Sequence, residues 1–210
     1  MLTVLVASSK GGCGKSTLVT QLASHWAEDG KHTAIVDADR QQSSFRWASR
    51  RPDNVPGVLG LEGGRKALDK LPPDTQRVLI DTAAGSQERE LEPYLEKADV
   101  LLVPVLPSTF DLDATFDFLA HLQQVPRIKR GKLPVGLVGN RLKPWTNASQ
   151  EAMARLAAEA PFPLVAQLRD SQAYVLLAAL GKGIFDYASE NVRSHQEDWK
   201  QLLRWIKRQH

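Results

Sequence analysis

The sequence predicts an α/β fold in which one doubly wound, mostly parallel sheet carries helices on both faces. Three observations support this fold class. Short apolar runs alternate with helical patterns along the 210 residues. A glycine-rich stretch, SSKGGCGKST at 8–17, joins the first apolar run to the first helical pattern, and two later apolar runs end in aspartates. This length is enough to bury one core without disulfides, so we expect a single domain over 1–210.

Strands are expected wherever short apolar, β-branched runs occur. The first run, LTVLVA, occupies 2–7. Five further runs predict strands at 32–39, 76–83, 99–106, 133–140 and 161–168, the last of them interrupted by prolines. The segment 52–64 holds two prolines and four glycines, which predicts an irregular connection rather than a regular element.

Helices are expected between these strands. The first follows the glycine-rich stretch, where Leu18, Leu22 and Trp26 recur at fourfold spacing until Gly30 ends the pattern. Further helices are predicted near 41–50, 87–97, 111–124, 147–159, 170–180 and 188–208. In the last of these, an apolar stripe (Trp199, Leu202, Leu203 and Ile206) lies opposite a basic face (Lys200, Arg204, Lys207 and Arg208).

Composition limits the class of protein. With 42% hydrophobic and 24% charged residues, the chain is typical of a soluble globular protein. No apolar run approaches the ~18 residues of a membrane span, and no basic leader precedes the first strand. We therefore expect a cytoplasmic protein. A pI of about 9.0 permits nucleic-acid binding without requiring it. The chain starts on its first strand, so no upstream helix-turn-helix domain and no sequence-specific DNA recognition are expected.

The stretch KGGCGKST is typical of a phosphate-binding loop. Ser9 interrupts the pattern GxxxxGK[ST], and the matching form is KGGxGK[ST] between a strand and a helix. The backbone N–H groups of the loop (Gly11, Gly12, Cys13 and Gly14) would face phosphate oxygens, and the helix N-terminus adds positive charge. Lys15 would reach the β- and γ-phosphates, Ser16 would ligate Mg²⁺ and Thr17 would contact the α-phosphate. A plain glycine turn needs no such order of residues. Cys13 is expected to be a small filler rather than a redox group.

The loop contains an additional lysine at its start, Lys10, and this residue carries a resemblance to a known family. With it the loop resembles that of the deviant Walker-A ATPases of the ParA/MinD type, closest to the short ParF-like ParA partition and positioning ATPases. This resemblance implies ATP and Mg²⁺ as cofactors, and a Lys10 that reaches across a dimer interface to the partner's nucleotide. Such a cation would neutralise charge that develops on the γ-phosphoryl group, as an arginine finger does.

Three aspartates at strand ends match the same family. In VDADRQ (36–41) the resemblance implies that Asp39 orients or deprotonates the attacking water and that Asp37 supports the magnesium shell. In VLIDTAAG (78–85) it implies that Asp81 holds Mg²⁺ through water. Carboxyl ends of strands are where open α/β sheets bind ligands. Arg40 stands where the family usually has proline, and Gly85 is expected to act as a switch glycine.

The same family resemblance implies roles for further residues along the chain. PVLPSTFDLDA (104–114) resembles the family's segment beside the dimer interface, where Asp111 could equally cap a helix. Asn140 is implied to read adenine, although an Asn at a strand end is more often a turn former. The stretch at 168–187, LRDSQAYVLLAALGKGIFDY, resembles the family's segment near its DNA-binding face, which implies that Arg169 and Lys182 contact DNA. The basic face of the last helix adds Arg204 and Lys207 as candidates for DNA contact.

The resemblance implies an ATP-dependent partitioning or positioning ATPase. Mg-ATP would close a homodimer that binds DNA non-specifically on the nucleoid, and a ParB-like or cargo-adaptor protein would stimulate weak hydrolysis. The cargo could be a plasmid, a chromosome or a body such as the carboxysome. One alternative is a MinD-like membrane-associated regulator, since the last helix could pack, contact DNA or lie on a membrane. Another is a metabolic or metallocluster P-loop enzyme, although the single cysteine disfavours a cluster.

Overall fold

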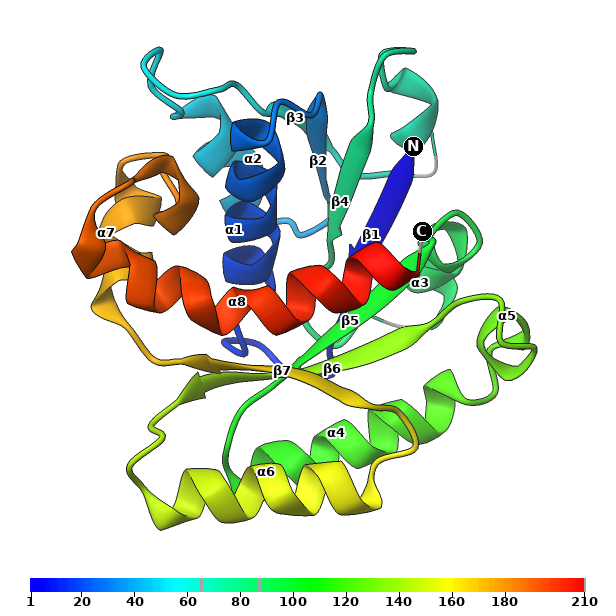
Figure 1. Ribbon diagram of the computed structural model, residues 1–210. Helices are drawn as coiled ribbons and strands as arrows, with labels where there is room; N and C mark the ends of the chain where they lie inside the picture. Colours follow the sequence, from blue (N-terminus) through cyan, green and yellow to red (C-terminus); the bar gives the residue numbers. More distant parts are fainter. Residues whose placement is uncertain (65, 87, 210) are drawn as a thin grey trace.

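The computed structural model describes residues 1–64, 66–86 and 88–209. Its centre is one seven-stranded sheet in the order β3-β2-β4-β1-β5-β6-β7, with every neighbouring pair parallel (Figure 1). The strands are β1 (Leu2–Val6), β2 (Thr33–Asp37), β3 (Leu59–Glu62), β4 (Arg77–Asp81), β5 (Val100–Val105), β6 (Val135–Leu142) and β7 (Leu164–Arg169). The predicted doubly wound α/β fold is confirmed.

Helices cover both faces of the sheet and bury two separate cores. One face carries α1 (Lys15–Glu28), α2 (Ser43–Ser49), α7 (Gln172–Ala179) and α8 (Glu190–Arg208), which lie in front in Figure 1. The other carries α3 (Glu88–Leu95), α4 (Thr109–Leu122), α5 (Pro126–Lys129) and α6 (Asn147–Glu159). Two short 3-10 helices occupy Leu68–Lys70 and Ile184–Asp186. Because a parallel sheet is buried on both faces, its inner strands are largely apolar, which is what made them predictable.

The expectation of an irregular segment over 52–64 was wrong in its second half. Residues 59–62 form β3, an edge strand that pairs with β2 alone. Its Gly60 lies against α2, where an added Cβ would come within 3.1 Å of the Phe45 ring and 3.3 Å of Ala48. The glycine that argued against a strand thus permits close packing between strand and helix.

The last helix packs against the sheet, as one of its three interpretations predicts. Trp199, Leu202 and Ile206 are buried among α1, β7 and the segment around Tyr174. The Trp199 Nε1–H donates to the Tyr174 hydroxyl at 3.0 Å. No helix that the structure describes has the length and apolar content needed to cross a bilayer.

Candidate functional site

The glycine-rich loop lies at the carboxyl edge of the sheet, between β1 and α1. Strand β1 is central, with β4 on one side and β5 on the other. The chain leaves β1 toward β2 and β3 on one side, and after β4 it continues on the other. Such a reversal opens a crevice at the carboxyl ends of the strands, where open α/β sheets bind ligands.

The backbone of the loop is fixed by glycines and by Asn140. Gly12 and Gly14 have φ values of 74° and 94°, which side chains disfavour. An added Cβ at Gly14 would collide with Asn140 Nδ2, and that amide donates to the Cys13 carbonyl at 2.8 Å. Asn140 therefore holds the loop in shape; its implied contact with adenine stays a prediction. Strand β6 ends at Leu142, so Asn140 lies two residues inside the strand, whereas the sequence predicted it at the end.

The two lysines of the loop point in different directions. Lys15 is buried, and its Nζ donates to Ser8 Oγ and to the Lys10 carbonyl, each at 3.2 Å. Within the described residues it has no ion pair. A buried ammonium whose two hydrogen-bond acceptors are both neutral is poised for an anion. Lys10 instead extends to the start of α4, where Nζ donates to the Phe110 carbonyl at 2.8 Å and lies 3.4 Å from Asp111 Oδ1.

Asp81 is a buried acidic side chain near the Ser16 and Ser44 hydroxyls. Its side chain is 1% exposed, and neither oxygen has a partner among the described residues. Burial raises the pKa of Asp81 to about 7; the Ser16 hydroxyl counteracts this pKa shift, and nearby Asp37 adds to it. Strand register places Asp37 directly beside Asp81, so the two carboxylates lie on adjacent strands.

Asp37 is fully engaged with the chain that follows it. Its Oδ2 accepts hydrogen bonds from the Ser44 N–H, the Ser44 hydroxyl and the Phe45 N–H at 2.8–2.9 Å. Its Oδ1 accepts from the Asp39 N–H at 3.0 Å. Asp37 therefore fixes the start of α2 and the turn that carries Asp39. These hydrogen bonds account for the buried position of Asp37 without a direct metal contact. Its support of a magnesium shell stays a prediction.

Asp39 lies two residues beyond β2, at the same edge of the sheet. Its Oδ1 accepts from the Gln41 N–H at 2.9 Å, which closes an Asx turn. The other oxygen has no hydrogen bond within the described part of the chain. Sequence reasoning missed two hydroxyls of this site, Ser8 and Ser44. Ser44 lies seven residues after Asp37 and donates to it from inside α2, whose N-cap residue Gln42 makes no side-chain cap, so no capping pattern marked this serine.

The donor set fits a magnesium ion held together with a phosphate. Mg²⁺ prefers oxygen ligands, keeps several waters and is bound by one or two carboxylates plus substrate phosphates. Asp81 supplies an unpartnered carboxylate close to the Ser16 hydroxyl. No cluster of three or more His, Cys, Asp or Glu side chains suited to a metal occurs in the described residues, so the protein alone offers no complete cage.

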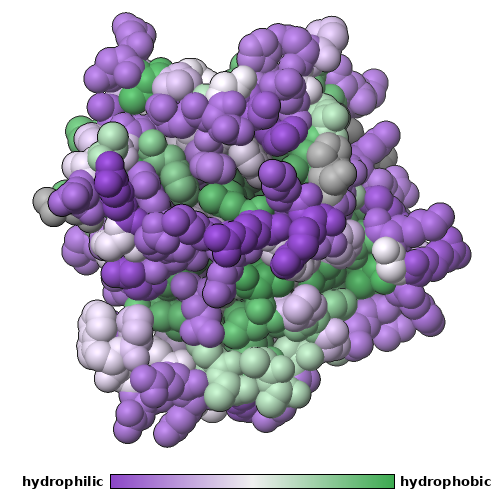
Figure 2. Space-filling view, viewed as in Figure 1, coloured by the Kyte–Doolittle hydropathy of each residue, from purple (hydrophilic) through white to green (hydrophobic). Residues whose placement is uncertain are grey.

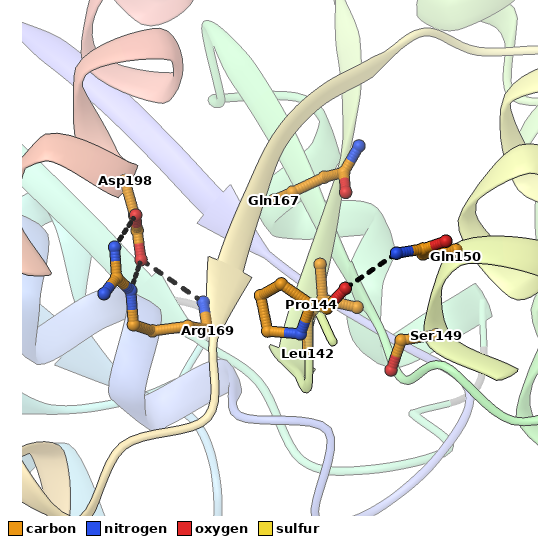
Figure 3. Close-up of a pocket in the computed structure, with 7 residues that line it drawn as sticks. All are labelled: Leu142, Pro144, Ser149, Gln150, Gln167, Arg169 and Asp198. Atoms are coloured by element: carbon orange, nitrogen blue, oxygen red, sulfur yellow. Dashed lines mark hydrogen bonds and ion pairs between the residues drawn. The ribbon is translucent and has the colours of Figure 1, made fainter. Parts of the chain in front are cut away.

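The four residues nominated for DNA are not brought together. Arg169, at the end of β7, is held by a bidentate ion pair with Asp198, with Nε–Oδ2 2.6 Å and Nη2–Oδ1 2.8 Å (Figure 3). The Lys182 Nζ lies 5.1 Å from the centre of the Tyr187 ring. Arg204 and Lys207 are exposed on the last turns of α8, toward the amino edge of the sheet. DNA contact by each of these residues stays a prediction.

Comparison with known proteins agrees with this geometry. Residues 4–184 match the CobQ/CobB/MinD/ParA nucleotide binding domain. The chain is 27% identical to the maintenance of carboxysome distribution protein A of Halothiobacillus neapolitanus over 209 residues, which covers 96% of this chain and 94% of that protein.

Solved structures share the fold. A chain of the Aquifex aeolicus MinC:MinD cell division protein complex has a TM-score of 0.73 at 14% identity, over 97% of this chain and 96% of that one. A Cyanothece McdA variant in complex with ATP has a TM-score of 0.71 at 17% identity, over 100% and 96%. At such identities the likeness shows the fold alone.

Proposed function

The chain belongs to the CobQ/CobB/MinD/ParA nucleotide-binding family, and from this premise we propose that it is an ATP-dependent partitioning or positioning ATPase. Mg-ATP bound at the loop 10–17 closes a homodimer, the dimer binds DNA non-specifically, and a ParB-like or cargo-adaptor protein stimulates slow hydrolysis that releases it. A full-length relative named for carboxysome distribution supports a positioning role. The proposal places the protein in the cytoplasm, on the nucleoid.

One observation carries this proposal: the two loop lysines diverge. Lys15 turns inward over its own loop, whereas the Lys10 ammonium extends outward to α4, with a side chain that is 39% exposed. A lysine that served only its own nucleotide is expected to turn over the loop as Lys15 does, whereas Lys10 is directed away from it toward Phe110 and Asp111. An exposed cation at the rim can instead reach a nucleotide bound by a second copy of the chain.

The residues divide the chemistry among them. Loop N–H groups and Lys15 bind and orient the phosphates, and the cluster of Asp81 and Ser16 would hold the metal, which adds positive charge at the β- and γ-phosphates when bound. Asp39 accepts a hydrogen bond or proton from the attacking water. Lys10 of a partner subunit stabilises the charge that develops on the transferred group.

The alternative, a MinD-like regulator that lies on a membrane, is less well supported. In that class of mechanism a terminal helix would need to present its apolar face to lipid. Here the apolar stripe of α8 is buried: Trp199 and Leu202 are 0% exposed and Ile206 is 2% exposed. A membrane-bound role would require this helix to leave its core.

Nucleotide-dependent dimerisation tests the proposal. Light scattering on a sizing column should give a mass near 23.2 kDa without nucleotide and roughly twice that with a slowly hydrolysed ATP analogue and Mg²⁺. Lys15→Ala should lose at least about 100-fold in ATP affinity, because two or more charge-assisted bonds disappear. The exposed Lys143→Ala is the matched control. A chain that stays monomeric with saturating ATP analogue, or a Lys15→Ala chain with normal affinity, would contradict the proposal.

A further inference from the structure

Helix α7 presents an uncovered apolar face. Val175, Leu176 and Leu180 lie on one side of this helix and its last turn, and they are 64%, 66% and 58% exposed. Figure 2 shows hydrophobic surface among hydrophilic side chains on the left of the molecule, where Figure 1 places α7. A helix that is apolar on nearly every side is normally buried on every side. Adjacent exposed aliphatic side chains of this kind mark a surface that another molecule covers.

A hollow of about 280 Å³ lies between α7, α2 and the start of α1, and it is basic. Arg46 and Arg50 line it from α2, one helical turn apart, so their guanidinium groups leave the same side of the helix. Neither guanidinium has an ion pair among the described residues. In the described part of the chain no carboxylate lines the hollow. Two unpaired cations beside aliphatic side chains favour a binder that carries carboxylates next to apolar groups.

Helices α2 and α7 are fixed to each other by contacts at their ends. The Trp47 Nε1–H donates to the Lys182 carbonyl at 3.1 Å, and Arg51 Nη1 donates to the Gly181 carbonyl at 3.3 Å. The buried ion pair between Arg51 and Asp186 lies beside these contacts. The apolar face and the two arginines are therefore held in place before anything binds, which lowers the entropy cost of binding.

We propose that this surface, Val175, Leu176 and Leu180 of α7 with Arg46 and Arg50 of α2, binds an acidic amphipathic helix of the adaptor protein. We call it the α2–α7 face. The inference rests on the proposed function and names the chemistry by which the adaptor is recognised. Leucines on one side of the bound helix cover the aliphatic side chains. Carboxylates one turn apart on that helix meet the two guanidinium groups, whose own spacing along α2 is about 6 Å.

Other occupants fit the α2–α7 face less well. Backbone phosphates of DNA would pair with Arg46 and Arg50 but would leave the aliphatic side chains of α7 in water. An anionic membrane would cover those side chains, but the plane of its headgroups cannot fill a hollow in which both arginines lie. Carboxylate side chains on a helix reach into such a hollow while the apolar side of the same helix lies on α7.

The α2–α7 face adjoins the nucleotide site. Ser16 and Thr17, at the start of α1, line the same hollow as the two arginines. Gln41 lines it as well, and its N–H donates to Asp39 in the turn that follows β2. A helix bound on the α2–α7 face therefore lies beside the loop that binds phosphate and beside the turn that carries Asp39.

Fluorescence anisotropy with a labelled synthetic peptide tests this proposal. The probe is a helix of about 18 residues with leucines at spacings of three and four and with glutamates and alanines elsewhere. A second peptide has lysine in place of every glutamate. Without nucleotide, the wild-type chain should bind the glutamate peptide at least about 10-fold more tightly than the lysine peptide. This measurement does not depend on ATP or on dimerisation.

Two variants of the α2–α7 face separate its charged and apolar parts. Arg46→Glu/Arg50→Glu should bind the glutamate peptide at least about 10-fold more weakly and should prefer the lysine peptide, a reversal that a misfolded chain cannot give. Leu176→Ser/Leu180→Ser should weaken binding of both peptides. The matched control is Arg130→Glu/Lys132→Glu, which reverses two exposed charges after α5 on the other face of the sheet. Thermal melting checks that every variant folds.

Three results would overturn the assignment of the α2–α7 face. The first is equal affinity of the wild-type chain for the two peptides. The second is a pair of face variants that bind the glutamate peptide as well as the control variant does. The third is a wild-type chain that binds no peptide but binds duplex DNA or phosphatidylglycerol vesicles, with that binding lost in the face variants. Failure of the proposed function looks different, because it is a wild-type chain that stays monomeric with ATP although it binds the glutamate peptide.

Discussion

In the single chain, Lys10 is held by Asp111. The Lys10 Nζ lies 3.4 Å from Asp111 Oδ1 and donates to the neighbouring Phe110 carbonyl at 2.8 Å, a contact that spans 100 positions of sequence. Asp111 itself is fixed at the first turn of α4, where Ser108 caps the helix. Under the proposed function, the ammonium would leave these partners to reach the nucleotide of another subunit, and we therefore propose that this contact opposes dimerisation.

Asp111→Asn should therefore ease dimerisation. The ion pair is partly exposed and worth no more than about 1 kcal/mol. A dimer releases two such pairs, so their loss should lower the protein concentration for half-dimerisation by up to about 30-fold. Asp113→Asn is the matched control, because Asp113 pairs with Arg155 at 3.2 Å and does not touch Lys10. Analytical ultracentrifugation with the ATP analogue measures both. Equal shifts in the two variants, or a weaker dimer for Asp111→Asn, would argue against a restraining role.

Asp39→Ala should separate binding from hydrolysis. Its carboxylate lies in a turn beyond β2 and makes no hydrogen bond with the phosphate loop in the described residues. The variant should bind ATP, dimerise and stay on DNA, because only the water loses its acceptor. Single-turnover ATPase assays should show a rate at least about 100-fold below wild type. A normal hydrolysis rate would remove Asp39 from the catalytic role.

Asp81→Asn should stabilise the protein in the absence of nucleotide and metal. Folding raises the pKa of this carboxyl from an ordinary 3.8 to about 7. Between these values the folded state holds a proton that the unfolded state has released, so stability falls as pH rises through this range. An amide does not titrate, so the variant should lose that part of the pH dependence while also losing its response to Mg²⁺. Melting temperatures at about pH 5 and about pH 8 measure the difference; parallel changes in the two proteins would refute it.

Asp186→Ala should be strongly destabilising. Asp186 pairs with Arg51 at 2.8 Å, and their side chains are 0% and 2% exposed. The pair ties the segment 181–186 to the end of α2, where Trp47 Nε1 also donates to the Lys182 carbonyl. Removing one partner leaves a buried charge, at a cost of about 3–5 kcal/mol in chemical denaturation. Asp170→Ala breaks the exposed pair with Arg141 and should cost less than about 1 kcal/mol. Comparable losses would contradict a special role for the buried pair.

Local patterns predicted most of the fold because the sheet is parallel and buried. Apolar runs marked six of the seven strands, and the loop and its aspartates fell at the carboxyl edge as the strand–helix alternation required. The edge strand β3 was not predicted. Among the described residues it pairs with β2 alone, and its Gly60 is typical of an irregular segment until α2 is packed against the strand.

Long-range pairing decided what the sequence could not predict at the site. Arg169 meets Asp198 across 29 positions, and Asn140 meets Cys13 across 127. No local sequence pattern marks a pair of residues at either separation. The ion pair of Arg169, a residue nominated for DNA contact, could therefore not be predicted from the sequence.

The central claim, that Lys10 acts on the nucleotide of the other subunit, has one direct test. Two inactive chains, Lys10→Ala and Asp39→Ala, are mixed at concentrations where energy transfer between labelled subunits shows mixed dimers. In such a dimer the Lys10→Ala subunit keeps its own Asp39 and receives Lys10 from its neighbour. If Lys10 acts across the interface, ATPase activity should return to about a quarter of wild type under random pairing. If mixed dimers form and the mixture remains as inactive as its parts, Lys10 serves only its own chain and the account is wrong.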